Sequence, residues 1–160
     1  MMTEEKALSS LAALCARGEH CTGELNDKMV RWGLDEEARR RITDYLVGHQ
    51  YVDDERYCRS FVNDKVKYDR WGRRKIEQAL WVKRIAPEVS GPVLDAVDDD
   101  DYLAALRPLL KAKWPTIKGA SDYERSMKLI KYAMGRGFEM RLIRRCVDEL
   151  ADVDESYDDD

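Results

Sequence analysis

Residues 76–97 read IEQALWVKRIAPEVSGPVLDAV, and the spacing of their apolar residues occurs twice more in this 160-residue chain. The pattern is centred on Ile85, and its other two copies are centred on Leu34 and Phe138, at intervals of 51 and 53 residues. In each copy, apolar residues stand nine, five and four positions before the centre and four, eight and twelve positions after it. These are the intervals at which side chains share one face of a helix, on both sides of a break. Each copy therefore predicts two amphipathic helices joined by a tight turn, and the recurrence predicts an array of small helical modules.

A further helical stretch precedes each pair, so each repeat is expected to hold three helices. We predict helical repeats over residues 1–50, 51–98 and 99–151, followed by a disordered acidic tail over residues 152–160. Modules of about 50 residues are marginally stable alone, so neighbouring modules are expected to stack. No segment shows the alternation of a half-buried strand. The predicted fold class is all-α, with three tandem three-helix units in an elongated array.

Residues at the expected helix ends agree with this division. Thr22, Asp35 and either Ser121 or Asp122 stand where N-caps are expected. Gly33 can take the left-handed conformation that ends a helix. Pro87 suits the first turn of a helix, because its missing N–H costs nothing there. The apolar positions of the recurring pattern, including Trp81, are expected to form the core.

Several classes of protein are excluded by what the sequence lacks. No run of about 18 or more apolar residues is present to span a membrane, and the N-terminal segment lacks the cationic region of a signal peptide, so we expect a cytoplasmic protein without a membrane partner. The four cysteines form no CxxC pair and the two histidines stand apart, so neither a metal nor another cofactor is expected. No phosphate-binding GxxxxGKS/T or nucleophile GxSxG motif occurs, and Asp53 and Asp54 have no metal cluster or base beside them. We therefore predict a protein that is not an enzyme and has no catalytic residues.

The net charge of −4 conceals a strong separation of charge along the chain. Residues 55–85 contain ten basic and four acidic residues, and residues 103–147 contain eleven basic and three acidic ones. Residues 148–160, in contrast, contain eight acidic residues and no basic one. Acidic stretches of this kind are usually solvated. The second and third repeats are therefore the basic part of the molecule.

Two clusters of basic side chains in these repeats are candidates for binding an acidic partner. The first surrounds the predicted helix start at Arg73, where positive charge opposes the helix dipole and is better placed if an anion meets it. Any solvated face carries some charge, but clustering on this scale favours a surface for nucleic acid or for an acidic protein. The candidate contact residues are Arg70, Arg73, Arg74, Lys75, Arg141, Arg144 and Arg145.

Several short motifs, in their order and spacing, resemble the RecX family of regulators of the bacterial recombinase RecA. The resemblance extends from about Ala7 to Leu150. Residues 52–57, VDDERY, look like the family's acidic signature at the start of the second repeat. Residues 71–76, WGRRKI, look like its glycine-centred segment, and residues 135–138, GRGF, are similar to the turn of its third repeat. The residues that carry the family signature are Asp53, Asp54, Glu55, Arg56, Tyr57, Phe61 and Gly72.

The resemblance implies a curved, all-helical molecule of three units that lies in the groove of the RecA–DNA filament. It implies a modulator, mainly an inhibitor, of RecA in homologous recombination, DNA repair and the SOS response. The implied partners are the RecA filament and single- or double-stranded DNA, and we expect a monomer. In one departure, Arg84 stands where the family often has Gly, so either the helix ends differently here or Arg84 is tolerated for its charge. From the residues alone, the expected role of Asp53 and Asp54 is to cap their own helix.

A stand-alone DNA-binding protein is the alternative function. Three-helix units with short turns resemble helix-turn-helix domains, whose basic helices enter a groove of DNA. Against this, no set of Asn, Gln and Arg side chains that would read bases gathers on one predicted helix face. Trp71, Trp81 and Trp114 are open to a second interpretation as stacking platforms for single-stranded bases.

Overall fold

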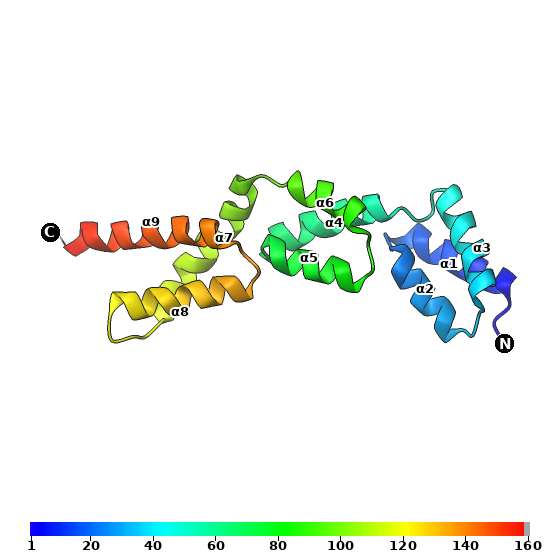
Figure 1. Ribbon diagram of the computed structural model, residues 1–160, viewed down its shortest axis with the longest axis horizontal. Coiled ribbons are helices and arrows are strands. Elements are labelled where there is room, and N and C mark those ends of the chain that lie inside the picture. Colours follow the sequence, from blue (N-terminus) through cyan, green and yellow to red (C-terminus); the bar gives the residue numbers. More distant parts are fainter. Residues whose placement is uncertain (159–160) are drawn as a thin grey trace. The chain divides into compact units, whose positions relative to one another are not determined.

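A computed structural model describes the backbone of residues 1–158 and the side chains of residues 1–150. Over the described backbone the chain forms nine α-helices and one short 3₁₀ helix, η1, and no strand (Figure 1). In chain order these are α1 (Glu4–Arg17), α2 (Thr22–Arg31), α3 (Glu36–Gly48), α4 (Asp54–Lys67), α5 (Arg73–Val82), α6 (Pro87–Asp95), α7 (Asp99–Lys113), η1 (Trp114–Thr116), α8 (Asp122–Gly135) and α9 (Met140–Asp158). The all-α fold predicted from the sequence is confirmed, with three α-helices in each predicted repeat.

The turn at the centre of the pattern has the same backbone conformation in all three repeats. The residue just before the centre has a positive φ each time, namely Gly33 (80°), Arg84 (61°) and Gly137 (92°). The amide of the central residue donates to the carbonyl five positions earlier, at N–O distances of 3.1, 3.1 and 3.3 Å. A left-handed residue with this hydrogen bond is a common way to end a helix. Arg84 therefore ends α5 in the way that glycine ends the equivalent helices.

Several helices begin at the expected caps, with one exception. The carboxylate of Asp35 accepts from the amide three residues later at 2.8 Å, and the hydroxyl of Ser121 does the same at 3.1 Å. Pro87 is the first residue of α6. Thr22, however, is the first residue of α2 and not its N-cap, and the N-cap, Cys21, makes no side-chain capping bond. A side chain far along the sequence supplies that cap, as described below.

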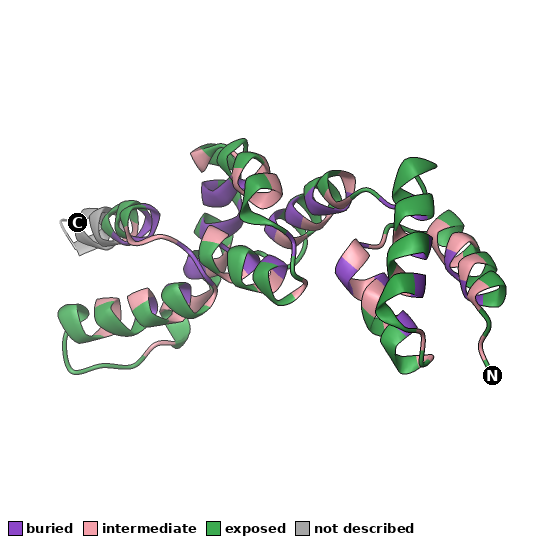
Figure 2. Ribbon diagram, turned by 45° about the vertical axis from the view of Figure 1, so that its right-hand side comes forward, coloured by how far each residue is buried: buried purple, intermediate pink, exposed green. Residues whose placement is uncertain are grey.

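Contacts between residues divide the chain into two compact units, which differ from the three repeats. The first unit is Met1–Phe61 with Leu80–Val93, and the second unit is Val62–Ala79 with Leu94–Asp160. The division passes through α4 and α5. In the first unit, α1, α2 and α3 pack around the buried side chains of Ala7, Leu11, Leu25, Met29, Ile42, Leu46 and Val52. In the second unit, α7, α8 and α9 pack around those of Leu103, Leu106, Leu110, Leu129, Ala133, Phe138, Leu142 and Ile143. Figure 2 shows the buried residues as stripes along the helices, with the opposite faces exposed.

One set of positions in the recurring pattern was wrongly assigned to the core by spacing alone. The residues nine and five positions before each centre are buried, but the residue four positions before it is exposed in every repeat. The exposed fractions are 51% for Val30, 69% for Trp81 and 46% for Met134. Successive helix positions differ by about 100° around the axis, so the position next to a buried one turns away from the core. Trp81 is thus a surface residue, contrary to the prediction.

Two other expectations concern the ends of the repeats. The backbone of α9 is helical as far as Asp158, so the helix extends into the segment 152–160 that was expected to be a disordered tail. Residues 159 and 160 lie outside the described part of the chain. The repeat bounds 1–50, 51–98 and 99–151 and the curvature of the array stay predictions. Among the helices of the described residues, none has both the length and the apolar character needed to cross a bilayer.

Candidate interaction surface

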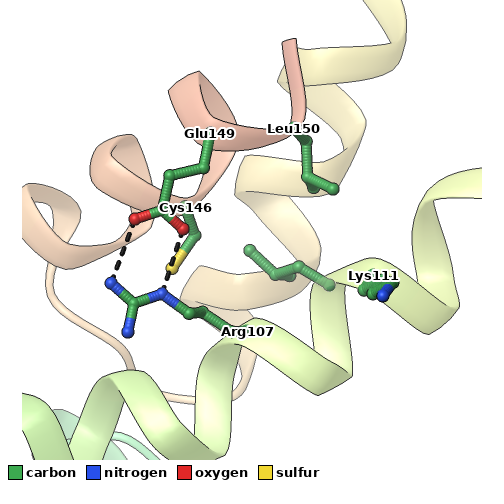
Figure 3. A pocket seen from close by; sticks show the side chains of 6 residues that line it. Arg107, Lys111, Cys146, Glu149 and Leu150 are labelled. Atoms are coloured by element: carbon green, nitrogen blue, oxygen red, sulfur yellow. Dashed lines mark hydrogen bonds and ion pairs between the residues drawn. The ribbon is translucent and has the colours of Figure 1, made fainter. Parts of the chain in front are cut away.

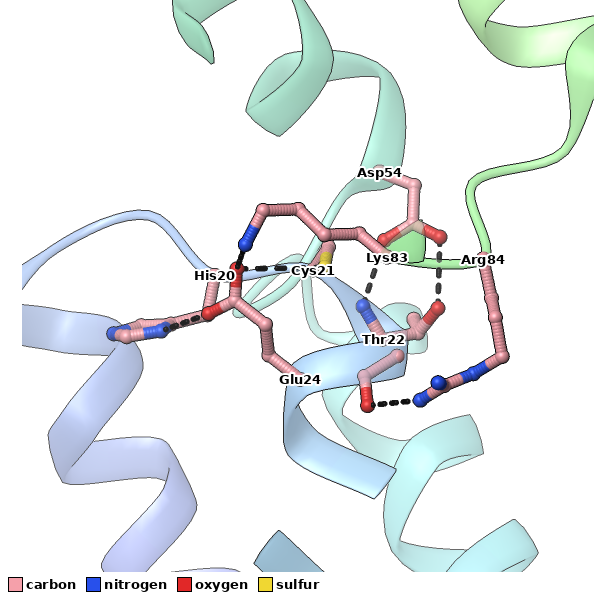
Figure 4. A network of polar contacts seen from close by, with 8 residues as sticks. His20, Cys21, Thr22, Glu24, Asp54, Lys83 and Arg84 are labelled. Carbon is pink, nitrogen blue, oxygen red and sulfur yellow. Dashed lines mark hydrogen bonds and ion pairs between the residues drawn. The ribbon is translucent and has the colours of Figure 1, made fainter. Parts of the chain in front are cut away.

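The two aspartates of the acidic signature make different contacts in the first unit. Asp53 accepts a hydrogen bond from the amide of Arg56 at 3.1 Å, which is the expected cap of its own helix, α4. Asp54 instead reaches the start of α2, where its two carboxylate oxygens accept from the amide of Thr22 at 2.8 Å and from its hydroxyl at 2.7 Å (Figure 4). Asp54 therefore supplies the cap that Thr22 was predicted to provide, and it ties α4 to α2.

Arg56 fastens the same signature to the loops that surround it. Its guanidinium donates to Glu19 at 2.6 Å and to the carbonyls of Gln50 and Tyr51 at 3.3 and 3.4 Å. Glu55 pairs with Arg59 one turn along α4 at 2.7 Å. The charged residues of the signature are thus occupied by contacts within the chain, which agrees with a structural role for them.

A carboxylate in the first repeat, Glu24, is the centre of a polar network in the first unit (Figure 4). It contacts Nδ1 of His20 at 3.1 Å, accepts from Nζ of Lys83 at 3.1 Å, and is hydrogen bonded to the hydroxyl of Tyr57. Partial burial raises the pKa of Glu24, but the hydrogen bonds from these three side chains outweigh burial and hold the pKa below its ordinary value. Burial, followed by the same hydrogen bond to Glu24, raises the pKa of Tyr57. The network ties the start of α2 to α4 and to the end of α5.

Arg84 and Gly23 complete this contact between the end of α5 and the start of α2. The guanidinium of Arg84 donates to the carbonyl of Gly23 at 2.8 Å and to Asp27 at 2.7 Å. A Cβ atom on Gly23 would lie 2.3 Å from the carbonyl oxygen of Lys83, so only glycine fits there. Arg84 therefore has a left-handed conformation together with two charge-assisted hydrogen bonds, which favours the second of the two alternatives given above, that Arg84 is tolerated for its charge.

The second unit contains an equivalent contact, between the start of α5 and the turn from α8 to α9. The amide of Gly72 donates to the carbonyl of Arg136 at 2.8 Å, and that of Arg74 donates to the carbonyl of Gly137 at 3.0 Å. A Cβ on Gly72 would lie 2.3 Å from Cα and N of Phe138. The guanidinium of Arg136 donates in return to the carbonyls of residues 69 and 70. The glycine of the family signature is therefore required by a close approach of two backbones.

This contact changes the interpretation of the basic cluster at the start of α5. Two amides at that helix end, those of Gly72 and Arg74, are already paired with carbonyls of the turn after α8, so neither needs an external anion as a partner. The guanidinium of Arg73 pairs with Glu77 at 2.6 Å and with Asp95 at 2.7 Å. These hydrogen bonds raise the pKa of Arg73. In the structure Arg73 is a residue that joins α5 to the end of α6.

Arg141 is engaged in the same way at the start of α9. It forms two parallel hydrogen bonds with Asp99, at 2.6 and 2.9 Å, and approaches Glu139 at 3.5 Å. The hydrogen bond with Arg141 lowers the pKa of Asp99. A paired guanidinium has less capacity for an external anion, because a new partner must displace the first. Lys75, from the first cluster, lies with Nζ 4.5 Å from the ring centroid of Trp71, and Lys65 lies 4.6 Å from that centroid.

Four of the predicted contact residues are exposed and form no direct ion pair with a described side chain, although Arg145 lies near enough to Asp99 and Glu149 to interact with their charges. Within the residues whose side chains are described, their guanidinium groups have no hydrogen bond or ion pair to another side chain. These residues are Arg70, Arg74, Arg144 and Arg145. Arg70 also has a φ of 54°, a left-handed conformation at the end of α4. A cation that stays solvated in the folded chain is the kind of group that an acidic partner can pair with.

A hollow of about 260 Å³ lies in the third repeat between α7 and α9 (Figure 3). Its lining includes Leu110, Cys146 and Leu150, and the guanidinium of Arg107 forms two hydrogen bonds of 3.0 Å with Glu149 at its edge. Burial, followed by the charge of Glu149, raises the pKa of the Cys146 thiol. A raised pKa lowers the fraction of thiolate, the nucleophilic form, at neutral pH.

Sequence reasoning missed the residues that join the repeats. Glu24 and Lys83 are 59 positions apart, and Thr22 and Asp54 are 32 apart, so no local pattern connects them. The one available signal was Gly23, a glycine in the first turn of a helix, where it has no capping role and lowers helix propensity. Such a glycine indicates a close approach of another backbone.

Two family models match successive segments of the chain. Residues 53–90 match the model for "RecX, second three-helix domain", and residues 99–147 match that for "RecX, third three-helix domain". The chain is similar to the regulatory protein RecX of Vibrio campbellii, with 30% identity over 125 residues that cover 78% of this chain and 79% of the relative. It is similar to that of Chlorobium limicola, with 29% identity over 148 residues that cover 91% and 89%. It spans between 54% and 63% of the length of the matched Clostridium relatives.

A solved structure also resembles this fold. The crystal structure of RecX from Lactobacillus salivarius superposes with a TM-score of 0.84 and covers 92% of this chain and 96% of its own. Its sequence identity is 18%, so this likeness concerns the fold alone.

Proposed function

Because the chain belongs to the RecX family of regulatory proteins, we propose that it binds the filament that the recombinase RecA forms on DNA and mainly inhibits its activity. Through RecA it would regulate homologous recombination, DNA repair and the SOS response. The observation that carries this proposal is the match to two successive RecX three-helix domains, together with the 30% identity to a regulatory protein RecX. We also propose that the protein is a cytoplasmic monomer and that it acts without a cofactor.

The distribution of unpaired cations supports binding to an acidic surface of the filament. After internal ion pairs are accounted for, Arg70 and Arg74 in the second repeat and Arg144 and Arg145 in the third remain exposed. DNA phosphates and acidic protein side chains are the partners that such groups attract, and the attraction weakens as salt rises. An array that contacts several subunits gains affinity through effective concentration, so individually weak contacts suffice.

The function is tested by the single-strand-dependent ATPase of RecA from the same organism, with this protein titrated in. Inhibition well below equimolar protein supports the proposal. No effect at equimolar protein, combined with tight binding to naked DNA, would contradict it and favour a stand-alone DNA-binding protein.

The basic surface is tested with a pair of charge-matched variants in the same assay. Arg74→Glu with Arg144→Glu removes two unpaired cations from the proposed surface, whereas Arg17→Glu with Arg40→Glu makes the same charge change at exposed positions of the first repeat. The first variant is expected to inhibit RecA less well at low salt, and the second is expected to resemble the wild type. Arg73 and Arg141 are left unchanged, because their substitution would also break the contacts with Asp95 and Asp99.

A further inference from the structure

The exposed apolar residue that recurs four positions before each repeat centre is a feature that the proposed function does not explain. Val30, Trp81 and Met134 are 51%, 69% and 46% exposed, whereas the residue just before each of them is at most 1% exposed. A single exposed apolar side chain is common on protein surfaces. Here the apolar side chain is exposed at the same position of all three repeats. Burial in the core cannot explain why this position is apolar, because the side chain faces solvent each time.

Trp81 has the surroundings of an interface anchor. It forms one wall of a surface hollow of about 330 Å³ that is otherwise lined by Arg84, Ile85, Ala86 and Pro87. Arg84 is the one charged residue that lines this hollow, and its guanidinium is already paired with Asp27. Tryptophan, together with tyrosine and arginine, is enriched among the residues that dominate the affinity of protein interfaces.

The chemistry shared by the three positions identifies the kind of partner. Valine and methionine have no aromatic ring, so a nucleobase cannot stack on two of the three sites. What recurs is apolar character at one position of each repeat. An exposed apolar side chain is complementary to an apolar socket on a protein. A partner that offers such a socket repeatedly is a polymer of identical subunits.

We propose that Val30, Trp81 and Met134 are apolar contacts, one in each repeat, that insert into equivalent sockets on successive protein subunits of the RecA filament. The inference rests on the proposed function, and it names protein and not DNA as the surface that these three residues meet. Trp81 contributes most, because it has the largest apolar side chain of the three.

The test measures binding of the full chain to RecA filaments assembled on single-stranded DNA, at low and at high salt. Trp81→Ala is expected to weaken binding by about tenfold or more, and the triple variant with Val30→Ala and Met134→Ala is expected to abolish it. The loss persists at high salt, since the contact is apolar, whereas the effect of Arg74→Glu with Arg144→Glu fades. Trp81→Leu retains most of the affinity if the socket is apolar.

Tyr68→Ala and Tyr123→Ala are matched controls, because these aromatic residues are 78% and 76% exposed but lie outside the recurring position. They are expected to bind as the wild type does. Normal binding by the triple variant, when the wild type binds, would overturn this inference and leave the proposed function standing. If Trp81→Ala and Trp81→Leu both lose binding to naked single-stranded DNA to the same extent, the inference is overturned and a base-stacking site is favoured. If the wild type does not bind the filament, the proposed function falls and this inference with it.

Discussion

At the scale of single residues, the acidic signature combines two kinds of cap. Asp53 caps the helix that it precedes, whereas Asp54 caps α2, which begins 32 residues earlier in the chain. A local cap stabilises one helix, but a long-range cap also fixes the position of that helix against another. Asp54 therefore has the larger structural effect of two adjacent and chemically identical residues.

Asp54→Ala is expected to lower the free energy of unfolding by about 2 kcal/mol, because the amide and hydroxyl of Thr22 both lose their acceptor. Asp53→Ala, which removes one cap from the first turn of α4, is expected to cost about 1 kcal/mol. Urea denaturation followed by circular dichroism measures both. In a Thr22→Val background the effect of Asp54→Ala should shrink, and equal effects in the two backgrounds would contradict this assignment.

Glu24 predicts a dependence of stability on pH. Its folded-state pKa lies below the ordinary value of 4.5, so its contribution is complete above about pH 4.5 and is lost as the pH falls through the lower folded-state pKa. The difference in melting temperature between the wild type and Glu24→Gln should therefore be constant near neutral pH and shrink in acid. A difference that grows as the pH falls would show that the sign is wrong. Asp44→Asn, at an exposed position of α3, is the control.

At the scale of elements, the two described contacts between repeats have the same form. In each, the start of the second helix of one repeat lies against the turn that follows the second helix of the next repeat. In the first unit the start of α2 meets the end of α5, and in the second unit the start of α5 meets the turn after α8. Each contact requires a glycine, Gly23 or Gly72, since a Cβ would approach the opposing backbone to 2.3 Å. The start of α8 differs, because Ser121 and Glu124 close it with their own side chains: Ser121 accepts from the amide of Glu124, and Glu124 accepts from the amide of Ala120.

Gly72→Ala is expected to destabilise the protein by about 2 to 3 kcal/mol, because the new methyl group must push the backbone of Phe138 away. Gly48→Ala is the matched control within α3, where a Cβ would meet nothing within 4 Å. That substitution should instead raise stability by about 0.5 to 1 kcal/mol, through the higher helix propensity of alanine. Chemical denaturation measures both variants, and a neutral Gly72→Ala would contradict the close approach.

At the scale of the whole molecule, the acidic and basic residues are separated along the chain although the net charge is only −4. Internal ion pairs neutralise part of the basic charge, including Arg73, Arg107 and Arg141. The unpaired cations of the second and third repeats then share the chain with six acidic residues between positions 151 and 160. Acidic residues linked to a basic surface compete with an acidic partner for it.

Removal of residues 151–160 is expected to strengthen binding to RecA filaments at low salt, since it changes the net charge from −4 to +2 by deleting six acidic residues and no basic one. The gain should disappear at high salt, where charges are screened. A control chain in which the six acidic residues are replaced by Asn and Gln should behave like the truncated one. An affinity that is unchanged at low salt would exclude competition by this segment.

The sequence by itself determined the repeat, the helical fold class, the three turns and the family, because each depends on spacings of a few residues or on short motifs. The starts of α3 at Asp35 and of α8 at Ser121 followed from the same local rules. Only the tertiary structure decided that Trp81 faces solvent, that Asp54 caps a distant helix, and that Arg73 and Arg141 are paired within the chain. Periodicity identifies an apolar face but not which of two adjacent positions on it another helix will cover. The partner of a charged side chain is likewise chosen by contacts between segments tens of residues apart, and no local pattern encodes them.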